Sequence, residues 1–213
     1  MDYQAFKNKV RGLALLRSAD LLHFERNPQI IRNQLTRWQA KKLLLKLRKG
    51  VYLLNRADRV IRTSHAFLAS QLYTPSYISL EYALNFYGLI PEAVFTVTSI
   101  TTRKTIRFNT PEGDFVYQHI QPNAFRGFRV LKDDAGLSYF IAEPEKAVVD
   151  FLYFNFRKKV ADRIARFRDS YRFQHVNQLK PRKIMRYAGL FHNAAVSDAA
   201  GEFCVFIKEE RKR

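Results

Sequence analysis

Cysteine is nearly absent from this sequence, with Cys204 the only one. A single cysteine cannot form an intrachain disulfide and provides no zinc-finger spacing, so a disulfide scaffold and a cysteine-based zinc site are excluded. Long apolar runs are missing too: no stretch approaches the roughly 18 apolar residues of a membrane span, and residues 1–10 lack the apolar core of a signal peptide. These absences predict a cytoplasmic protein.

The sequence motifs of common catalytic sites are also missing. There is no G-x-S-x-G, no P-loop, no G-x-G-x-x-G and no HxxxH or HxH spacing. No Asp-x-Asp pair could hold the magnesium of a nucleotidyltransferase, and the only acidic-x-Lys triplet of nuclease type is 210–212. The best-grouped carboxylates, Glu143, Glu145 and Asp150, lie where a helix is expected to start, which favours capping. We therefore expect that the protein is not an enzyme and binds no metal and no cofactor. The alternative is a nuclease or a nucleotidyltransferase.

Acidic residues are scarce relative to basic ones, at 19 against 37, and the net charge is +18. Residues 1–62 hold 15 basic and 4 acidic side chains (net +11), residues 63–150 hold 7 and 9 (net −2), and residues 151–213 hold 15 and 6 (net +9). Because so much positive charge repels itself in the folded state, a polyanionic partner is expected. The distribution predicts two basic surfaces around a near-neutral middle.

A capped helix with one polar, basic face is predicted to begin at Pro28. Asn27 is a good N-cap and proline is tolerated in the first turn. Ile31, Leu35 and Trp38 recur at helical spacing and predict a buried stripe. At 100° per residue the other side carries Gln29, Asn33, Thr36 and Arg37, with Arg32 at its edge and Lys41 and Lys42 at its end. Arg and amide side chains make paired hydrogen bonds to guanine and adenine in a major groove.

A short hairpin is predicted directly after this helix, with strands over 43–47 and 51–54 and a tip at 48–50. Two helices are expected before it, over 3–16 and after a capping Ser18. Three helices followed by such a hairpin outline a winged helix-turn-helix domain over residues 1–55. Taken alone, a basic helix face and a Lys-Gly tip are about as often a solvated surface as a DNA contact.

Residues 58–213 are expected to form an α+β domain. Helices are predicted over 58–72 and 76–87, then a mixed or antiparallel sheet of four or five strands, then a helix from Glu143 to about Phe156. Residues 157–213 look helical and basic, with a further helix ending near Gly189 and a frayed tail. An apolar stripe through Phe167 and Tyr171 is flanked by Lys158, Lys159, Arg163, Arg166, Arg168 and Arg172. Aromatic residues between these arginines are expected to form core with a basic rim.

Several segments in this order carry a family resemblance. They are LRKGVYLL in the hairpin, LEYAL…YGLIPE, the T-x-T-x-x-x-T-R-K region and PEKAVVDFLY. Over residues 15–156 the chain resembles the AbiEi-like antitoxins, predicted transcriptional regulators of bacterial phage-defence and type IV toxin–antitoxin loci. The resemblance implies a DNA-binding domain joined to an α+β antitoxin domain, autorepression of a two-gene operon through its own promoter, and a nucleotidyltransferase-fold toxin as partner.

Site residues follow from the resemblance and the helix pattern together. DNA contacts would fall on Gln29, Arg32, Asn33, Thr36, Arg37, Lys41 and Lys42 of the helix and on Arg48 and Lys49 at the hairpin tip. A second face for the DNA backbone would comprise Lys158, Lys159, Arg163, Arg166 and Arg172. An RNA-binding or toxin-binding module without promoter specificity is the other alternative.

Overall fold

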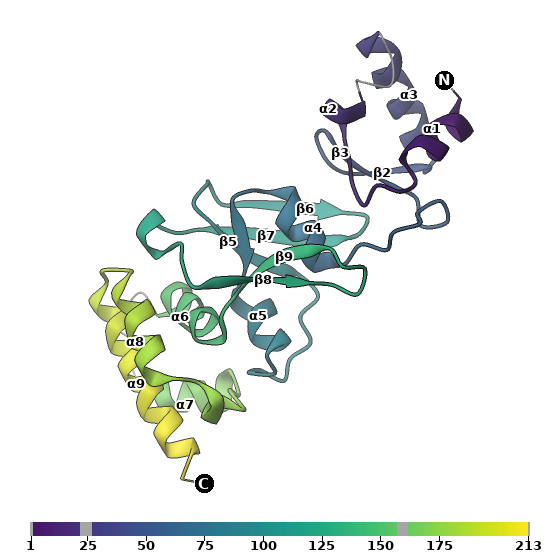
Figure 1. Ribbon diagram of the computed structural model, residues 1–213. Helices are drawn as coiled ribbons and strands as arrows, with labels where there is room; N and C mark the ends of the chain where they lie inside the picture. The colour runs from purple at the N-terminus through teal and green to yellow at the C-terminus, as the bar shows by residue number, and fades with distance from the viewer. Residues whose placement is uncertain (1, 22–26, 157–161, 213) are drawn as a thin grey trace.

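Two hydrophobic cores organise the molecule, which is elongated, with the N-terminal helices at one end and the C-terminal helices at the other (Figure 1). The computed structural model describes residues 2–21, 27–156 and 162–212. The smaller core lies between residues 3 and 54 and includes Phe6, Ile31 and Trp38. The larger core surrounds a sheet and extends to Ile207 in the last helix. The fold is mixed α+β, as the sequence predicts.

The N-terminal part combines short helices with a small antiparallel sheet of order β1-β3-β2. Its elements are α1 (Tyr3–Val10), β1 (Leu16–Arg17), α2 (Ser18–Leu21), α3 (Pro28–Ala40), β2 (Leu44–Arg48) and β3 (Val51–Leu54). The hairpin predicted over 43–54 is confirmed. The prediction of a helix over 3–16 is wrong at its end, because Leu16 instead pairs with Tyr52 of β3. Ser18 is the first residue of α2 rather than its cap.

The β2–β3 hairpin belongs to both cores. Leu44, Tyr52 and Leu54 pack in the smaller core, whereas Leu47, Val51 and Leu53 pack in the larger one. All four residues of β3 are buried, and β2 lies against β6 (Ile106–Thr110) of the large sheet. The hairpin is therefore the structural joint between the two parts of the molecule.

A six-stranded mixed sheet forms the centre, where the sequence predicts four or five strands. Its strands are β4 (Ser76–Ile78), β5 (Val97–Thr101), β6, β7 (Gly113–His119), β8 (Phe128–Lys132) and β9 (Ser138–Ala142), in the order β6-β7-β5-β4-β9-β8. Pairs β4–β9 and β5–β7 are parallel, and the others are antiparallel. The unexpected strand is β4, which occupies the start of the helix predicted over 76–87; only α5 (Leu80–Phe86) is helical there.

Helices cover both faces of this sheet. Tyr117 donates a hydrogen bond to the Ala69 carbonyl of α4 (His65–Leu72), at 2.7 Å, while Tyr77 donates to Asp150 of α6 (Pro144–Asn155), at 3.0 Å. The strand register puts these two tyrosines on opposite faces, so α4 and α6 also lie on opposite faces. The helix predicted from residue 58 begins only at His65, where Ser64 is the N-cap. The predicted helix from Glu143 to Phe156 is confirmed as α6.

The C-terminal part extends from the α6 side of the sheet. It contains α7 (Arg163–Ala165), a π-helical turn (Arg166–Ser170), α8 (Pro181–Gly189) and α9 (Ala194–Glu210), with single 3-10 turns at Val176–Gln178 and, earlier, at Pro122–Ala124. The prediction of a frayed tail over 208–213 is wrong for residues 208–210, because α9 continues to Glu210. Phe167 packs against Phe203 and Phe206 of α9, so the aromatic residues here form core, as predicted.

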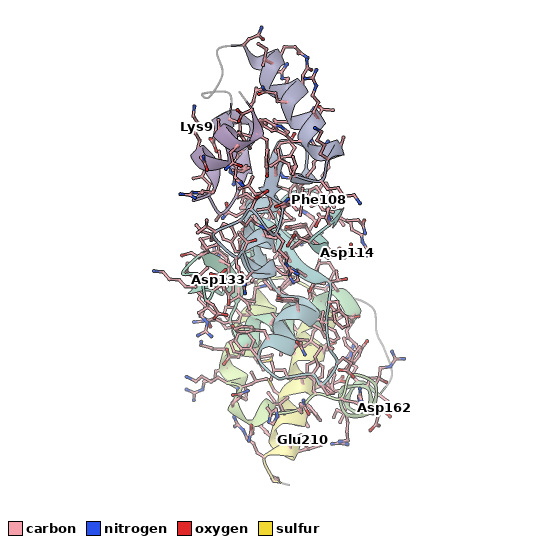
Figure 2. The ribbon with its side chains drawn as sticks, turned by 90° about the vertical axis from the view of Figure 1, so that its right-hand side faces the viewer. Lys9, Phe108, Asp114, Asp133, Asp162 and Glu210 are labelled. Atoms are coloured by element: carbon pink, nitrogen blue, oxygen red, sulfur yellow. The ribbon has the colours of Figure 1, made fainter. Side chains whose placement is uncertain are left out.

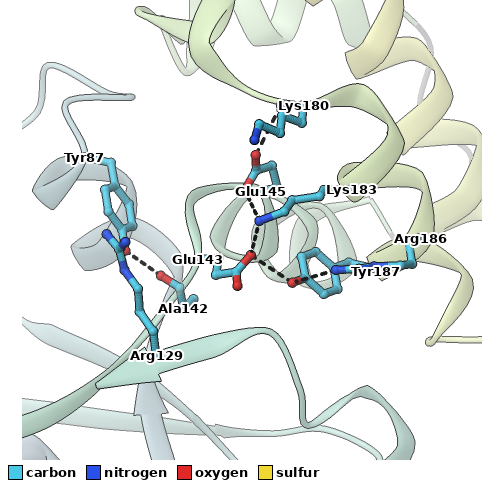
Figure 3. A network of polar contacts seen from close by, with 9 residues as sticks. All are labelled: Tyr87, Arg129, Ala142, Glu143, Glu145, Lys180, Lys183, Arg186 and Tyr187. Atoms are coloured by element: carbon cyan, nitrogen blue, oxygen red, sulfur yellow. Dashed lines mark hydrogen bonds and ion pairs between the residues drawn. The ribbon is translucent and has the colours of Figure 1, made fainter. Parts of the chain in front are cut away.

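The grouped carboxylates around α6 make side-chain contacts other than capping bonds, although Glu143 is the N-cap residue of the helix. Glu143 accepts hydrogen bonds from Lys183 (2.6 Å) and Tyr187 (3.0 Å) of α8, and Glu145 accepts one from the Lys180 backbone N–H (3.2 Å) (Figure 3). Asp150 lies fully buried in an ion pair with Lys146. Glu143 therefore has the predicted N-cap position, but the side chains of Glu143 and Glu145 connect α6 to α8 and Asp150 is paired in the core, so the expected side-chain capping bonds are not formed. Among the described residues no helix is long and apolar enough to cross a membrane.

Candidate nucleic-acid interface

The orientation of α3 is fixed by its ends and its buried stripe. The Asn27 side chain accepts a hydrogen bond from the Gln29 backbone N–H (2.9 Å), which confirms the predicted cap. Ile31, Leu35 and Trp38 are buried. The Trp38 ring stacks on Phe6 of α1, with 4.5 Å between ring centroids. Because this side of α3 is locked against α1, the opposite side faces solvent.

The exposed side of α3 carries the side chains that the sequence predicts for DNA contact. Gln29, Arg32, Asn33, Thr36 and Arg37 are all exposed. The Gln29 amide donates to Asn33 Oδ1 at 3.0 Å, and the Thr36 hydroxyl donates to the Arg32 carbonyl at 3.0 Å. These contacts hold the amide pair together on the helix surface, between guanidinium groups. The structure thus brings the predicted helix residues together on one accessible face.

Two ammonium groups extend this face at the C-terminal end of α3. Lys41 and Lys42 are both exposed. Lys42 has a left-handed backbone, with φ +56°, and the following Leu43 N–H donates to the Trp38 carbonyl at 2.9 Å. A lysine occupies here the position that glycine usually takes after a helix. The chain turns sharply into β2, which leaves both cations beside the hairpin.

The hairpin tip contributes one of its two predicted cations to this surface. Lys49 is exposed, and Gly50 (φ +77°) accepts a hydrogen bond from the Ser18 N–H at 2.9 Å, which holds the tip against α2. Arg48 is only half exposed and its Nε is buried. Burial raises the pKa of the Tyr117 phenol in the large sheet, and the positive charge of Arg48 partly offsets that rise. Arg48 is the last residue of β2 and its Nη1 donates to the Lys49 carbonyl at 3.4 Å, so Arg48 lies beside the tip and is less exposed than Lys49.

The surface formed by α3 and the hairpin tip is positive, and within the described ranges none of its cations is in an ion pair. Residues 27–55 contain seven basic side chains and no acidic one. None of the ion pairs found among the described residues involves Arg32, Arg37 or the lysines of this segment. Elsewhere many cations are neutralised, such as Lys7 by Asp58 at 3.0 Å. An external anion is the natural counter-charge for this face.

Sequence reasoning missed two side chains of this surface. Ile30 is 43% exposed and lies on α3 next to Asn33 and Arg37, three and seven residues on. Lys46 of β2 is exposed on the hairpin. The helical angle of Ile30 is a signal that could have placed it on the polar face, where an apolar group suits a thymine methyl. Lys46 could have been found from strand alternation.

The second basic face predicted in the C-terminal part does not exist as one surface in the described residues. Arg163 is buried and paired with Glu202 at 2.7 Å, which corrects its predicted exposure. Arg172 is exposed but donates to Glu92 at 2.9 Å and lowers the pKa of that carboxyl. Arg166 is exposed, and Lys158 and Lys159 lie outside the described residues. The helix that would have aligned these side chains stops at Ser170.

Comparison with known proteins adds no further assignment: no family model matches the chain, and no curated protein matches it either. Within the described residues, no group of three or more His, Cys, Asp or Glu side chains could hold a metal ion. The positive face of α3 and the hairpin tip is therefore the feature from which a function has to be argued.

Proposed function

We propose that this chain is a sequence-specific DNA-binding regulator that contacts DNA through α3 and the tip of the β2–β3 hairpin. One observation carries the proposal: an exposed helix face that combines two arginines, two amides and a hydroxyl and has no acidic neighbour in its segment. The element order α1-β1-α2-α3-β2-β3 and the sheet order β1-β3-β2 also agree with a winged helix-turn-helix.

Different side chains of this surface would serve different parts of the duplex. Arg37, Asn33 and Gln29 have the donors and acceptors that read guanine and adenine edges, so they would provide sequence preference. Lys41, Lys42 and Lys49 are flexible point charges at the rim of the face, suited to phosphates. Phosphate contacts would supply much of the affinity, and the helix face would supply the specificity.

The biological setting of the proposal comes from the family resemblance over residues 15–156. We propose that the regulator is an antitoxin of a type IV toxin–antitoxin system and represses its own two-gene operon. A nucleotidyltransferase-fold toxin would be the product of the second gene. The two-part architecture, with a small N-terminal core and a larger α+β core, is compatible with that role.

Two alanine variants test the docking arrangement on a duplex selected from a random-sequence pool by the wild-type protein. Arg37→Ala should weaken specific binding by about 1–3 kcal/mol and relax the preference at one base pair. Lys49→Ala should weaken binding to all duplexes and reduce the slope of log K against log salt by about 0.9. Fluorescence anisotropy over a salt series measures both effects. Arg126→Ala, which removes an exposed arginine beyond the large sheet, is the matched control and should change neither.

The arrangement would be refuted if both variants bound like the control across the salt series. Equal affinity of the wild type for random duplex, RNA and the selected site would instead favour a binding module without promoter specificity. Metal-dependent turnover of a nucleic acid by the purified protein would favour the enzymatic alternative.

A further inference from the structure

A polar cleft lies between the connection that follows the hairpin and the β6–β7 turn of the large sheet. Its volume is about 440 Å³, and it is lined by Arg56, Arg59, Arg62, Thr63 and Glu112. The first four belong to the connection between β3 and α4, and Glu112 lies in the turn between β6 and β7. Every lining residue is charged or polar, so the cleft is not an incomplete piece of core.

The charges in this cleft do not cancel. Three guanidinium groups face one carboxylate, which leaves a net charge of +2. The Arg59 side chain is only 8% exposed; its Nη2 donates to Glu112 Oε1 at 2.7 Å and its Nη1 to the Thr63 hydroxyl at 3.5 Å. Arg56 and Arg62 are exposed, and neither takes part in the ion pairs found in the described ranges.

The other acidic residues near the cleft form no ion pair with Arg56 or Arg62 in the part of the chain that the structure describes. Asp58, in the same connection, accepts hydrogen bonds from Tyr3 (2.7 Å) and Lys7 (3.0 Å) of α1. Asp133 and Asp134 line a second hollow, which shares Arg62 and Thr63 with the cleft, and neither carboxylate forms an ion pair with Arg62 in the described residues. Of these, Asp133 accepts a hydrogen bond from the Ser64 hydroxyl at 2.6 Å.

We propose that this cleft binds a phosphate dianion. Guanidinium forks match phosphate oxygens with paired, charge-assisted hydrogen bonds, and the net charge of the lining equals that of the dianion in magnitude. Among the described residues the lining includes no aromatic or aliphatic side chain on which a base could stack, so the phosphoryl group itself is what the cleft recognises.

Glu112 regulates access to the buried guanidinium in this arrangement. An entering phosphate competes with the Glu112 carboxylate for Arg59, because both are anionic acceptors for the same fork. Since Asp58 connects the segment to α1 and Glu112 connects it to the sheet, an occupied cleft changes the contacts between the two parts of the molecule.

Isothermal titration of the full chain with inorganic phosphate and with pyrophosphate, at low salt and without DNA, tests the site. The wild type should bind at one saturable site, and the double variant Arg56→Ala/Arg62→Ala should bind about tenfold or more weakly. Glu112→Gln removes the competing charge and should bind several-fold, about three- to tenfold, more tightly. Arg126→Ala controls for loss of net charge and should bind like the wild type. Circular dichroism checks that each variant is folded.

A random-sequence duplex as competitor distinguishes free phosphate from a DNA phosphate as the source. If the cleft accepts a DNA phosphate, pyrophosphate should weaken duplex binding by the wild type more than by the double variant. If it accepts only small anions, the two proteins should respond equally. No saturable phosphate binding, or equal binding by the wild type, the double variant and Glu112→Gln, would overturn the proposal. The calorimetric titrations with phosphate and pyrophosphate contain no DNA, so failure of DNA binding by α3 would not affect their result.

Discussion

Lys42 contributes a positive charge to the α3 surface at a backbone position where a side chain lowers the stability of the fold. Its φ of +56° lies in the left-handed region, where a side chain with a Cβ costs roughly 1–2 kcal/mol more than glycine. The helix end nevertheless keeps the two hydrogen bonds from Lys42 and Leu43 to the carbonyls of Gln39 and Trp38. A strained lysine on a surface whose cations form no ion pair in the described ranges is consistent with selection for its ammonium group.

Lys42→Gly is therefore expected to raise the free energy of unfolding by about 1 kcal/mol, because glycine removes the left-handed strain. The same variant should bind DNA more weakly, because a cation is lost. Urea denaturation measures the first effect and anisotropy the second. Lys41→Gly is the matched control: Lys41 has φ −83°, so glycine there relieves no strain and should not stabilise the protein. An unchanged or lowered stability of Lys42→Gly would contradict this account.

At the scale of elements, the contact of α6 with α8 depends on Glu143 (Figure 3). The carboxylate accepts hydrogen bonds from Lys183 and Tyr187, and these contacts with the Lys183 charge hold the pKa of Glu143 below its ordinary value of 4.5. A carboxyl whose pKa is lower in the folded than in the unfolded state stabilises the fold above its unfolded pKa. That stabilisation is lost as the pH falls through the folded pKa.

Glu143→Gln should accordingly lower the free energy of unfolding by about 1 kcal/mol at pH 7, since the ion pair is lost while the shape is kept. The difference from the wild type should shrink as the pH falls below the ordinary carboxyl pKa of 4.5, because protons then bind the unfolded wild type more readily than the folded protein. Chemical denaturation at several pH values gives both numbers. Glu81→Gln on α5 makes the same change at a carboxylate for which the described residues show no ion pair. A difference in the free energy of unfolding between Glu143→Gln and the wild type that stays constant down to pH 3 would exclude the ionic explanation.

Elements with strong local signals were predictable from the sequence, and elements set by distant contacts were not. Asn27-Pro28 and the periodic stripe of α3 are local, as are the alternation and turn residues of the later strands. By contrast, β4 is a short, fully buried strand with no alternation, and only its pairing with β5 and β9 distinguishes it from a helix start. Leu16 joins β3 through residues far along the chain.

In the candidate site, too, features set by local sequence were predictable and features set by distant contacts were not. The exposure of the α3 face follows from its own periodicity and could be predicted. The partial burial of Arg48 depends on the packing of β2 against β6 of the large sheet, and the burial of Arg163 depends on Glu202 of α9. Nothing local in PEKAVVDFLY indicates that Lys146 is fully buried with Asp150, because a lysine at that spacing is usually solvated.

At the scale of the whole molecule, the shared hairpin should couple the two cores. Opposite sides of β2 and β3 pack into different cores, so neither core is complete without the hairpin. Tyr3 and Lys7 of α1 add polar contacts to Asp58 in the connection that follows. Figure 2 shows the resulting order along the long axis, from Lys9 in the N-terminal part to Glu210 in the last helix.

We therefore expect a single cooperative unfolding transition. Trp38 is the only tryptophan and lies in the smaller core, so its fluorescence reports that core, whereas far-ultraviolet circular dichroism reports mainly the larger part. The two denaturation curves should coincide. Leu53→Ala, on the large-core side of the hairpin, should lower the free energy of unfolding by about 2–5 kcal/mol and move the midpoints of both curves together to lower denaturant. Separate midpoints for the two probes would show that the parts unfold independently.

Sequence-specific DNA binding through α3 can be measured on the DNA just upstream of the protein's own gene. Footprinting and titration at physiological salt would compare that DNA with a shuffled duplex of the same composition. We expect a defined footprint and a preference of about 10³ or more for the native sequence, which is strongly reduced in Arg37→Ala. Equal affinity for the native and shuffled duplexes, with no footprint, would contradict the proposal.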